Sequence, residues 1–270
     1  MTQKITNKTL LLTAVIGSLL IMAMVTVNTL RISKRSNDAT NEAVAAVSSF
    51  YLDAMADRRA KTITNLINNN FDEMGKAVAF IEDEQVNSQE ELRNTIGKIK
   101  SLLGLSRFAL VDKDNIVYTQ YTTYSGRTRH AFLSEETIKG RTISTVSLYG
   151  SSKQLCLVIP TPDLSIMGKP FKACFVQLDI KDIVDLLALD NHGGTHFALY
   201  SKNGGNLSGT ELGPVISDHN LFDAIKGIVS EDVWKENHES FENAARGSMT
   251  FVSGGAEETL CYVPIQGTDS

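Results

Sequence analysis

The first long apolar stretch of the chain covers residues 9–30 and contains no charged residue. At about 1.5 Å per residue, a helix of this length reaches roughly 33 Å, enough to cross a hydrocarbon core of about 30 Å. The stretch is too long for a secretory signal peptide, and no convincing small-x-small cleavage site follows it. It therefore predicts a transmembrane anchor after a short tail over 1–8. Lys4 and Lys8 precede it and three basic residues follow it, so the flanking charges do not decide its orientation.

A helical pattern follows over residues 37–81, where apolar residues recur at steps of three and four, without proline and with one glycine. Charged residues crowd its first half, and the apolar stripe broadens after Ile63. We therefore expect a stalk helix whose end packs on a domain. The Asn68-Asn69-Asn70 run and an imperfect heptad argue against a long uninterrupted coiled coil.

A second, shorter helix is predicted to start at Ser88 and to end at Gly104. Ser88 and Glu91 have the spacing of a capping box, and glycine commonly ends a helix. Apolar residues between these signals predict one buried face: Leu92, Ile96, Ile99, Leu102 and Leu103.

Alternating runs then predict antiparallel strands. Residues 107–111 and 116–121 flank the turn formers of 112–115 and predict a β-hairpin. Residues 122–140 are polar, aromatic and irregular. Further strands are expected over 142–148, 154–160 and 171–178, and Asp179 is expected to cap a helix that runs through Leu189.

The chain then repeats itself. RFALVDKDNIVYT at 107–119 matches HFALYSKNGGNLS at 196–208 at a constant offset of 89 (197 minus 108), and each copy predicts a strand that ends at a polar turn. Helices over 221–229 and 231–244 and a strand pair over 248–252 and 258–263, joined by Gly254-Gly255, are expected after the second copy. The pattern predicts an α+β fold with two stacked modules and antiparallel sheets.

The second module is expected to be unfinished. It shows three strand-like runs against about five in the first, and the sequence ends at Ser270 where a closing strand would be expected. This favours an amino-terminal part of a longer protein.

Composition narrows the function classes. The chain has 270 residues, of which 42% are hydrophobic and 21% charged, and its net charge is −5, so it lacks the basic surface that nucleic acid requires. Its three cysteines lie in strand-like runs without CxxC spacing. Buried free thiols are the favoured interpretation, although Cys156 and Cys174 could pair if neighbouring strands bring them together.

No catalytic constellation is present in the sequence, and we expect no cofactor and no catalytic role for these residues. His192 and His196 have a spacing that could join two imidazoles on a helix, but the two glycines between them favour a loop rather than a metal site.

The best candidate for ligand binding is the irregular segment of the first module. Aromatic faces and guanidinium donors concentrate there, and such groups suit a small anionic or zwitterionic ligand. The alternative is a surface loop with hydrated arginines. The candidate residues are Tyr118, Tyr121, Tyr124, Arg127, Arg129 and His130.

This order of parts resembles the double Cache, or tandem PAS-like, sensor region of bacterial transmembrane receptors. The likeness covers the anchor, the long helix, the FALVDKDNIVYT and FALYSKNGG openings and the closing SMTFVSGGAEETLCYVPIQGTDS, in which Ser270 stands where family members often have Trp. Members that bind amino acids carry Arg-x-Trp-Tyr in the candidate ligand segment. Arg127 and Arg129 precede Thr and His here, so amino-acid recognition does not carry over.

The resemblance implies a membrane-distal module over 105–190 and a membrane-proximal module over 191–270, after a helical region over 31–104. It also implies an inner-membrane receptor of two-component signal transduction, a homodimer with residues 31–270 outside the cytoplasm and most similar to hybrid sensor histidine kinases. A membrane diguanylate cyclase or a non-signalling anchored binding protein is the alternative.

Overall fold

The computed structural model describes residues 2–126, 130–134, 138–146, 153–188, 195–208 and 220–265. The chain divides into two units, Met1–Leu52 and Asp53–Ser270, and the first unit is formed by the opening part of one long helix.

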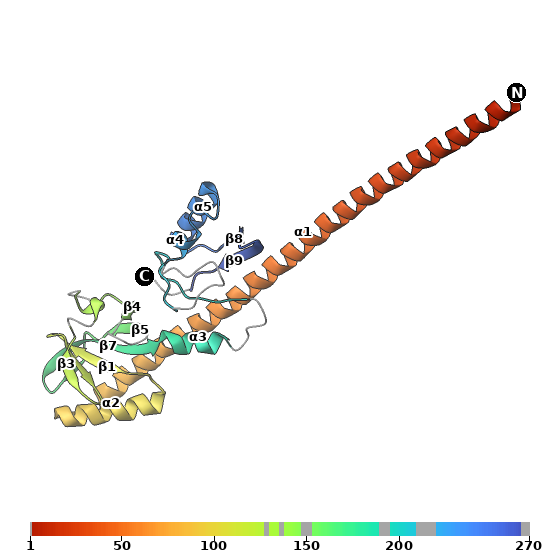
Figure 1. Ribbon diagram of the computed structural model, residues 1–270. Coiled ribbons are helices and arrows are strands. Elements are labelled where there is room, and N and C mark those ends of the chain that lie inside the picture. Colours follow the sequence, from red (N-terminus) through yellow and green to blue (C-terminus); the bar gives the residue numbers. More distant parts are fainter. Residues whose placement is uncertain are drawn as a thin grey trace. The chain divides into compact units, whose positions relative to one another are not determined.

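This helix, α1 (Thr2–Asp83), runs without interruption for 82 residues (Figure 1). The predicted stalk over 37–81 lies within it, which confirms that stretch as helical. The predicted anchor over 9–30 also falls within it, but many side chains of that stretch lie outside the described residues. Among the described residues, no helix offers a segment both long enough and apolar enough to span a bilayer.

The last third of α1 buries one face in the second unit. Its buried residues follow Ile63 at steps of three and four, as the broadening apolar stripe predicts, and they are Ile63, Ile67, Phe71, Met74, Ala77 and Ile81. They belong to a core cluster that also contains the buried face of α2 (Gln89–Leu103). Figure 1 shows α2 beside the end of α1.

The two predicted ends of α2 are confirmed. The Ser88 side chain accepts a hydrogen bond from the Glu91 N–H, and Gly104 has a φ of 66°, which favours glycine. The predicted buried face needs one correction, because Leu102 is 68% exposed. Leu103 continues the stripe of Ile99 instead, and Leu102 lies about 100° away from it around the helix.

The first module is built on one antiparallel sheet with strand order β3-β2-β1-β7-β5-β4, and β6 pairs with β7 outside this path. Its elements are β1 (Ala109–Asp112), β2 (Ile116–Thr119), β3 (Thr123–Ser125), a 3-10 helix η1 (Ala131–Ser134), β4 (Thr142–Val146), β5 (Gln154–Pro160), β6 (Ser165–Ile166), β7 (Lys169–Asp179) and α3 (Ile180–Ala188). The predicted hairpin, the three later strands and the helix after Asp179 are therefore confirmed, while the ends at 147–148 and Leu189 lie outside the described residues.

Alternation along the strands gives this sheet two buried faces. On the inner face, side chains such as Leu110, Leu157 and Val176 pack in the cluster of α1 and α2. On the outer face, side chains such as Val117 and Phe175 pack in a separate cluster.

We call the described residues 130–134 together with Ile138 the covering segment. Phe132, Leu133 and Ile138 of this segment are buried in the outer-face cluster. The sheet is therefore covered on both sides, by helices on one and by an irregular segment on the other.

The cysteines of the first module stay reduced. Cys156 of β5 pairs in register with Gln177, whereas Cys174 of β7 pairs with Ile159, and the two side chains belong to opposite faces of the sheet. Both are buried free thiols, so the favoured interpretation is confirmed for them and the alternative of a disulfide between them is wrong, whereas Cys261 is a free cysteine that is only half-buried.

The segment predicted to be the second module contains α4 (Leu221–Ile225), α5 (Glu231–Glu242), and a hairpin of β8 (Gly247–Ser253) and β9 (Ala256–Tyr262). The predicted strand pair and the helix predicted from 231 are confirmed, but the helix predicted over 221–229 ends at Ile225. Gly227 has a φ of 86°, outside the helical region, and Lys226 and Val229 form an isolated bridge there. The predicted strand at the start of the repeat is wrong, because residues 195–199 are irregular and Tyr200 forms an isolated bridge with Asn206. A strand needs a neighbouring strand with which to form hydrogen bonds. Within the described residues β8 and β9 pair only with each other, so residues 195–199 have no such neighbour.

The polar turns of the two copies nevertheless share their geometry at the offset of 89. Asn115 has a φ of 64° and Gly204 a φ of 80°. Asp112 Oδ1 accepts a hydrogen bond from the N–H four residues on at 2.8 Å, and Ser201 Oγ does the same at 3.1 Å. The sequence repeat therefore corresponds to a repeated turn in which different side chains supply the same acceptor.

Candidate functional site

The outer face of the first sheet is the best candidate for a binding site, because polar side chains are buried there among apolar ones. Gln154 opens β5 and is 1% exposed, and His130 opens the covering segment and is 2% exposed. Burying a polar group removes it from water, and this costs free energy unless the group forms a hydrogen bond inside the protein. Two such groups over one apolar face suggest specificity for a polar ligand.

His130 is held by aromatic neighbours from three directions. Its ring centroid lies 4.8 Å from that of Phe175 on β7 and 5.5 Å from that of Phe132, and Tyr124 Oη lies 3.1 Å from its Nε2. Its backbone N–H donates to the Gly126 carbonyl at 3.1 Å. The imidazole is therefore fixed against the centre of the outer face.

Gly126 permits this arrangement by its lack of a side chain. A Cβ added there would lie 2.4 Å from Leu133 Cδ1 and 2.7 Å from Val117 Cγ2. Gly126 therefore lies close against Val117 of the sheet and Leu133 of η1.

Gln154 lies at the end of the sheet that is nearest to α3. It pairs with Val146 on one side and with Asp179 on the other. Its Oε1 is buried and has no hydrogen-bond partner in the part of the chain that the structure describes. A buried amide oxygen without a donor is costly, by about 1–3 kcal/mol, so this atom is suited to receive a donor from a bound molecule.

Cys156 is the next inward residue of β5 on this face. Burial raises the pKa of its thiol to about 12, and a hydrogen bond with Gln177 opposes that shift. The thiol is therefore protonated at neutral pH and is not a nucleophile.

The structure brings together only part of the predicted site. Tyr124 and His130 meet on the outer face, whereas Tyr118 lies on the inner face and Tyr121 is 78% exposed beside Lys100. The reason is the alternation of β2, which turns Val117 outward and Tyr118 inward. The predicted residues Arg127 and Arg129 lie outside the described residues.

Tyr118 has a structural partner. Its hydroxyl donates to Asp112 Oδ2 at 3.0 Å, and both side chains are buried. Burial raises the pKa of Tyr118 to about 12, and the Asp112 carboxylate adds to the shift. Asp112 Oδ1 also accepts two backbone hydrogen bonds in the β1–β2 turn. With the Tyr118 hydroxyl on Oδ2, both oxygens of this buried carboxylate therefore have hydrogen-bond donors.

Gln154 was not among the predicted site residues, although the sequence carries a signal for it. Residues 154, 156 and 158 lie on one face of a strand whose neighbours are apolar, so a glutamine at the first of them is a polar group in a buried row. Phe175 carried no such signal, because a phenylalanine in a buried strand is ordinary core.

The metal alternative receives no support from the described residues, where no three His, Cys, Asp or Glu side chains are grouped to hold an ion. His196 is exposed, and His192 lies outside the described residues.

Comparison with known proteins gives the fold. No family model matches the chain, and no curated protein matches it. Among solved structures, the ligand-binding domain of the Pseudomonas aeruginosa amino acid chemoreceptor PctB, in complex with L-Gln, is 16% identical, with 82% of this chain and 86% of that chain covered and a TM-score of 0.56.

Two further structures have the same fold. The sensory domain of the Campylobacter jejuni chemoreceptor Tlp3, with isoleucine bound, is 11% identical over 82% of this chain and 90% of that chain, with a TM-score of 0.54. The extracellular domain rpHK1S-Z16, described as that of a histidine kinase, is 12% identical over 83% of this chain and 92% of that chain, with a TM-score of 0.58. The chain therefore has the fold of extracellular sensor domains of chemoreceptors and histidine kinases.

Proposed function

We propose that this chain is the ligand-sensing, extracytoplasmic portion of a transmembrane receptor of the double Cache kind. Residues 105–190 would form the membrane-distal module and residues 191–270 the membrane-proximal one. The fold supports a sensor role, since solved structures of similar fold are extracellular domains of chemoreceptors and of proteins described as histidine kinases. The repeated turn at the offset of 89 supports the division into two modules.

The observation that carries a ligand-binding role is the buried Oε1 of Gln154 on the outer face, which has no hydrogen-bond partner among the described residues. An acceptor in that position requires a donor, so we infer a small ligand that presents an N–H or O–H group to Gln154. Tyr124 and His130 would bound the same face nearer its centre. Arg127 and Arg129 remain candidates for an anionic group of the ligand.

The remainder of the receptor is inferred from the long helix. Residues 9–30 would be the inner-membrane anchor, with 1–8 in the cytoplasm and 31–270 outside. The output would be a cytoplasmic histidine kinase, and the exposed apolar side chains Val44, Val47 and Phe50 of α1 would be covered in a homodimer.

Ligand binding is tested by thermal unfolding of the full chain in detergent with single amino acids and small carboxylic acids as probes. A probe at 100 times its dissociation constant stabilises the folded chain by about 2.7 kcal/mol, which raises the melting temperature by roughly 5–10 °C. Gln154→Met keeps the side-chain volume but removes the acceptor, so it should abolish the shift without lowering the unliganded melting temperature. Silence of every probe, or an equal shift in Gln154→Met, would refute the proposed site.

Topology is tested separately by fusing a reporter enzyme after Ile81. The proposal requires that a reporter active only outside the cytoplasm be active in this fusion. Activity of a reporter that functions only in the cytoplasm would overturn the assigned orientation and, with it, the extracytoplasmic sensor.

A further inference from the structure

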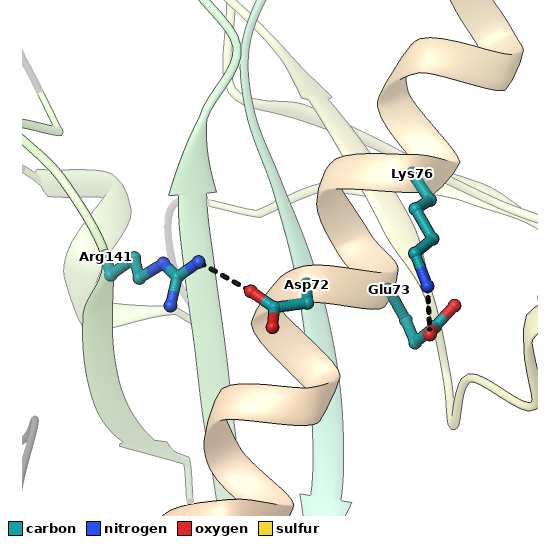
Figure 2. A network of polar contacts seen from close by, with 4 residues as sticks. All are labelled: Asp72, Glu73, Lys76 and Arg141. Carbon is teal, nitrogen blue, oxygen red and sulfur yellow. Dashed lines mark hydrogen bonds and ion pairs between the residues drawn. The ribbon is translucent and has the colours of Figure 1, made fainter.

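Arg141 joins the two sides of the first sheet. It stands three residues after Ile138, the last buried residue of the covering segment, and directly before β4, which ends the strand order of the sheet. Its backbone therefore lies between the covering segment and the edge strand β4. Its side chain, in contrast, contacts α1 on the inner face, as Figure 2 shows.

Two contacts attach Arg141 to α1. Its Nη2 donates to Asp72 Oδ1 at 2.8 Å, and its guanidinium carbon lies 5.1 Å from the ring centroid of Phe71. Phe71 is 2% exposed and belongs to the inner-face core, so it is a fixed part of the helix packing. A guanidinium suits this place because it can pair with a carboxylate and lie on an aromatic face at once.

The charges around this contact leave Asp72 available to Arg141. The neighbouring carboxylate of Glu73 is paired with Lys76 on the same helix at 2.7 Å (Figure 2). That pair is internal to α1 and does not reach the sheet. Asp72 is therefore the acidic group of this turn that faces the strand edge.

The contact is weak enough to change without unfolding the module. The side chains of Arg141 and Asp72 are 52% and 60% exposed, and exposed ion pairs contribute little to stability because water screens them. Coupling between sites in proteins typically corresponds to 5- to 150-fold changes in affinity, so a contact at the lower end of that scale suffices to bias a two-state element. A link of this kind can be made or broken by a ligand.

We propose that Arg141 is a coupling residue that transmits displacement of the covering segment on the outer face to α1 through Asp72 and Phe71. The proposal rests on the proposed function for its biological meaning, because a ligand on the outer face would move the covering segment. Its mechanical content is independent of any ligand. The residue touches no reacting or ligand-binding atom, and it acts by position.

The test is amide hydrogen exchange of the full chain in detergent, read at residues 67–76 of α1. His130→Ala, which loosens the covering segment, should accelerate exchange there about two- to fivefold, the range expected for loss of one exposed ion pair. In an Arg141→Ala background, His130→Ala should cause no further acceleration at these amides. The double variant Arg141→Asp with Asp72→Arg should restore the response in part, because it rebuilds the ion pair without the aromatic contact.

Two further variants serve as a replacement for His130→Ala and as a control. Tyr124→Phe removes only the hydroxyl that contacts His130, and it replaces His130→Ala if that variant does not fold. Lys76→Ala breaks the neighbouring ion pair within α1 and should leave the response to His130→Ala unchanged. An equal response with and without Arg141, or no response in α1 at all, would overturn the coupling role, whereas failure of every ligand probe would refute the proposed function alone.

Discussion

Replacement of Tyr118 by phenylalanine measures whether this residue has a structural role. The variant keeps the ring, which packs at 5.4 Å from Phe171, and loses the hydroxyl that donates to Asp112 Oδ2. Asp112 is 2% exposed, so water cannot readily replace the lost donor. Leaving a buried acceptor unsatisfied costs about 1–3 kcal/mol.

The expected result is a melting temperature lowered by roughly 2–12 °C, since about 2–4 °C corresponds to 1 kcal/mol in a domain of this size. Tyr121→Phe is the matched control, because Tyr121 is 78% exposed and its hydroxyl has no hydrogen-bond partner among the described residues. Its melting temperature should equal that of the unaltered chain. Equal melting temperatures for both variants would refute the argument that Tyr118 satisfies Asp112.

The pH dependence of stability is a second test of the contact between Tyr118 and Asp112. The pKa of Tyr118 is raised from its ordinary value of 10.0 to about 12, so the folded state favours the neutral phenol. Its contribution to the free energy of unfolding is complete below pH 10 and is lost as the pH rises through about 12. The difference in stability between the unaltered chain and Tyr118→Phe should therefore narrow over that interval, and a constant difference would contradict the assignment.

Three other predictions concern packing. Gly126→Ala should lower the free energy of unfolding by about 1–3 kcal/mol through its clash with Leu133. Gly140→Ala is the control, because nothing lies within 4 Å of the added Cβ, and its melting temperature should stay unchanged. An equal loss of stability in both variants would count against the described packing of the outer face. Gly75→Ala at an exposed position of α1 should raise the free energy of unfolding by about 0.5–1 kcal/mol in chemical denaturation, and a decrease would mean that α1 is not regular there. Cys156 should react with a thiol reagent only on unfolding, as followed by mass spectrometry, and rapid labelling of the native chain would contradict its burial and its pKa of about 12.

Much of the fold could be predicted because local signals and burial agree in the first module. Ser88 and Gly104 bound α2 by caps that act within one turn, and the run 154–160 coincides with β5. The start of the second repeat shows the limit of this reasoning. Residues 196–200 have the same apolar pattern as β1, but a strand also needs a neighbour, and pairing is a property of the whole fold.

The candidate site was harder to predict than the fold for a similar reason. Tyr118, Tyr121 and Tyr124 are close in sequence, and the prediction treated closeness as convergence. The structure separates them, because β2 turns Tyr118 inward, the following turn exposes Tyr121, and β3 returns Tyr124 to the outer face. Gln154 joins that face from a strand about 30 residues away; the pattern of β5 marks it as a buried polar residue but does not show that it shares a face with Tyr124.

The helix α1 is paired with both modules, so in the proposed receptor it is placed to carry a signal from either of them. Arg141 of the first module forms an ion pair with Asp72. Arg246 of the second module forms an ion pair with Asp57, and its Nη1 lies 3.7 Å from Asp53 Oδ2. Asp57 and Asp72 are 15 residues apart, which corresponds to about 22 Å along a helix. A continuous helix does not change its length over such a distance. If one module shifts and keeps its arginine contact with α1, the helix moves with it and is displaced relative to the other module. A ligand-induced change in the first module therefore needs no hinge between Asp57 and Asp72 to reach the contact of the second module with α1.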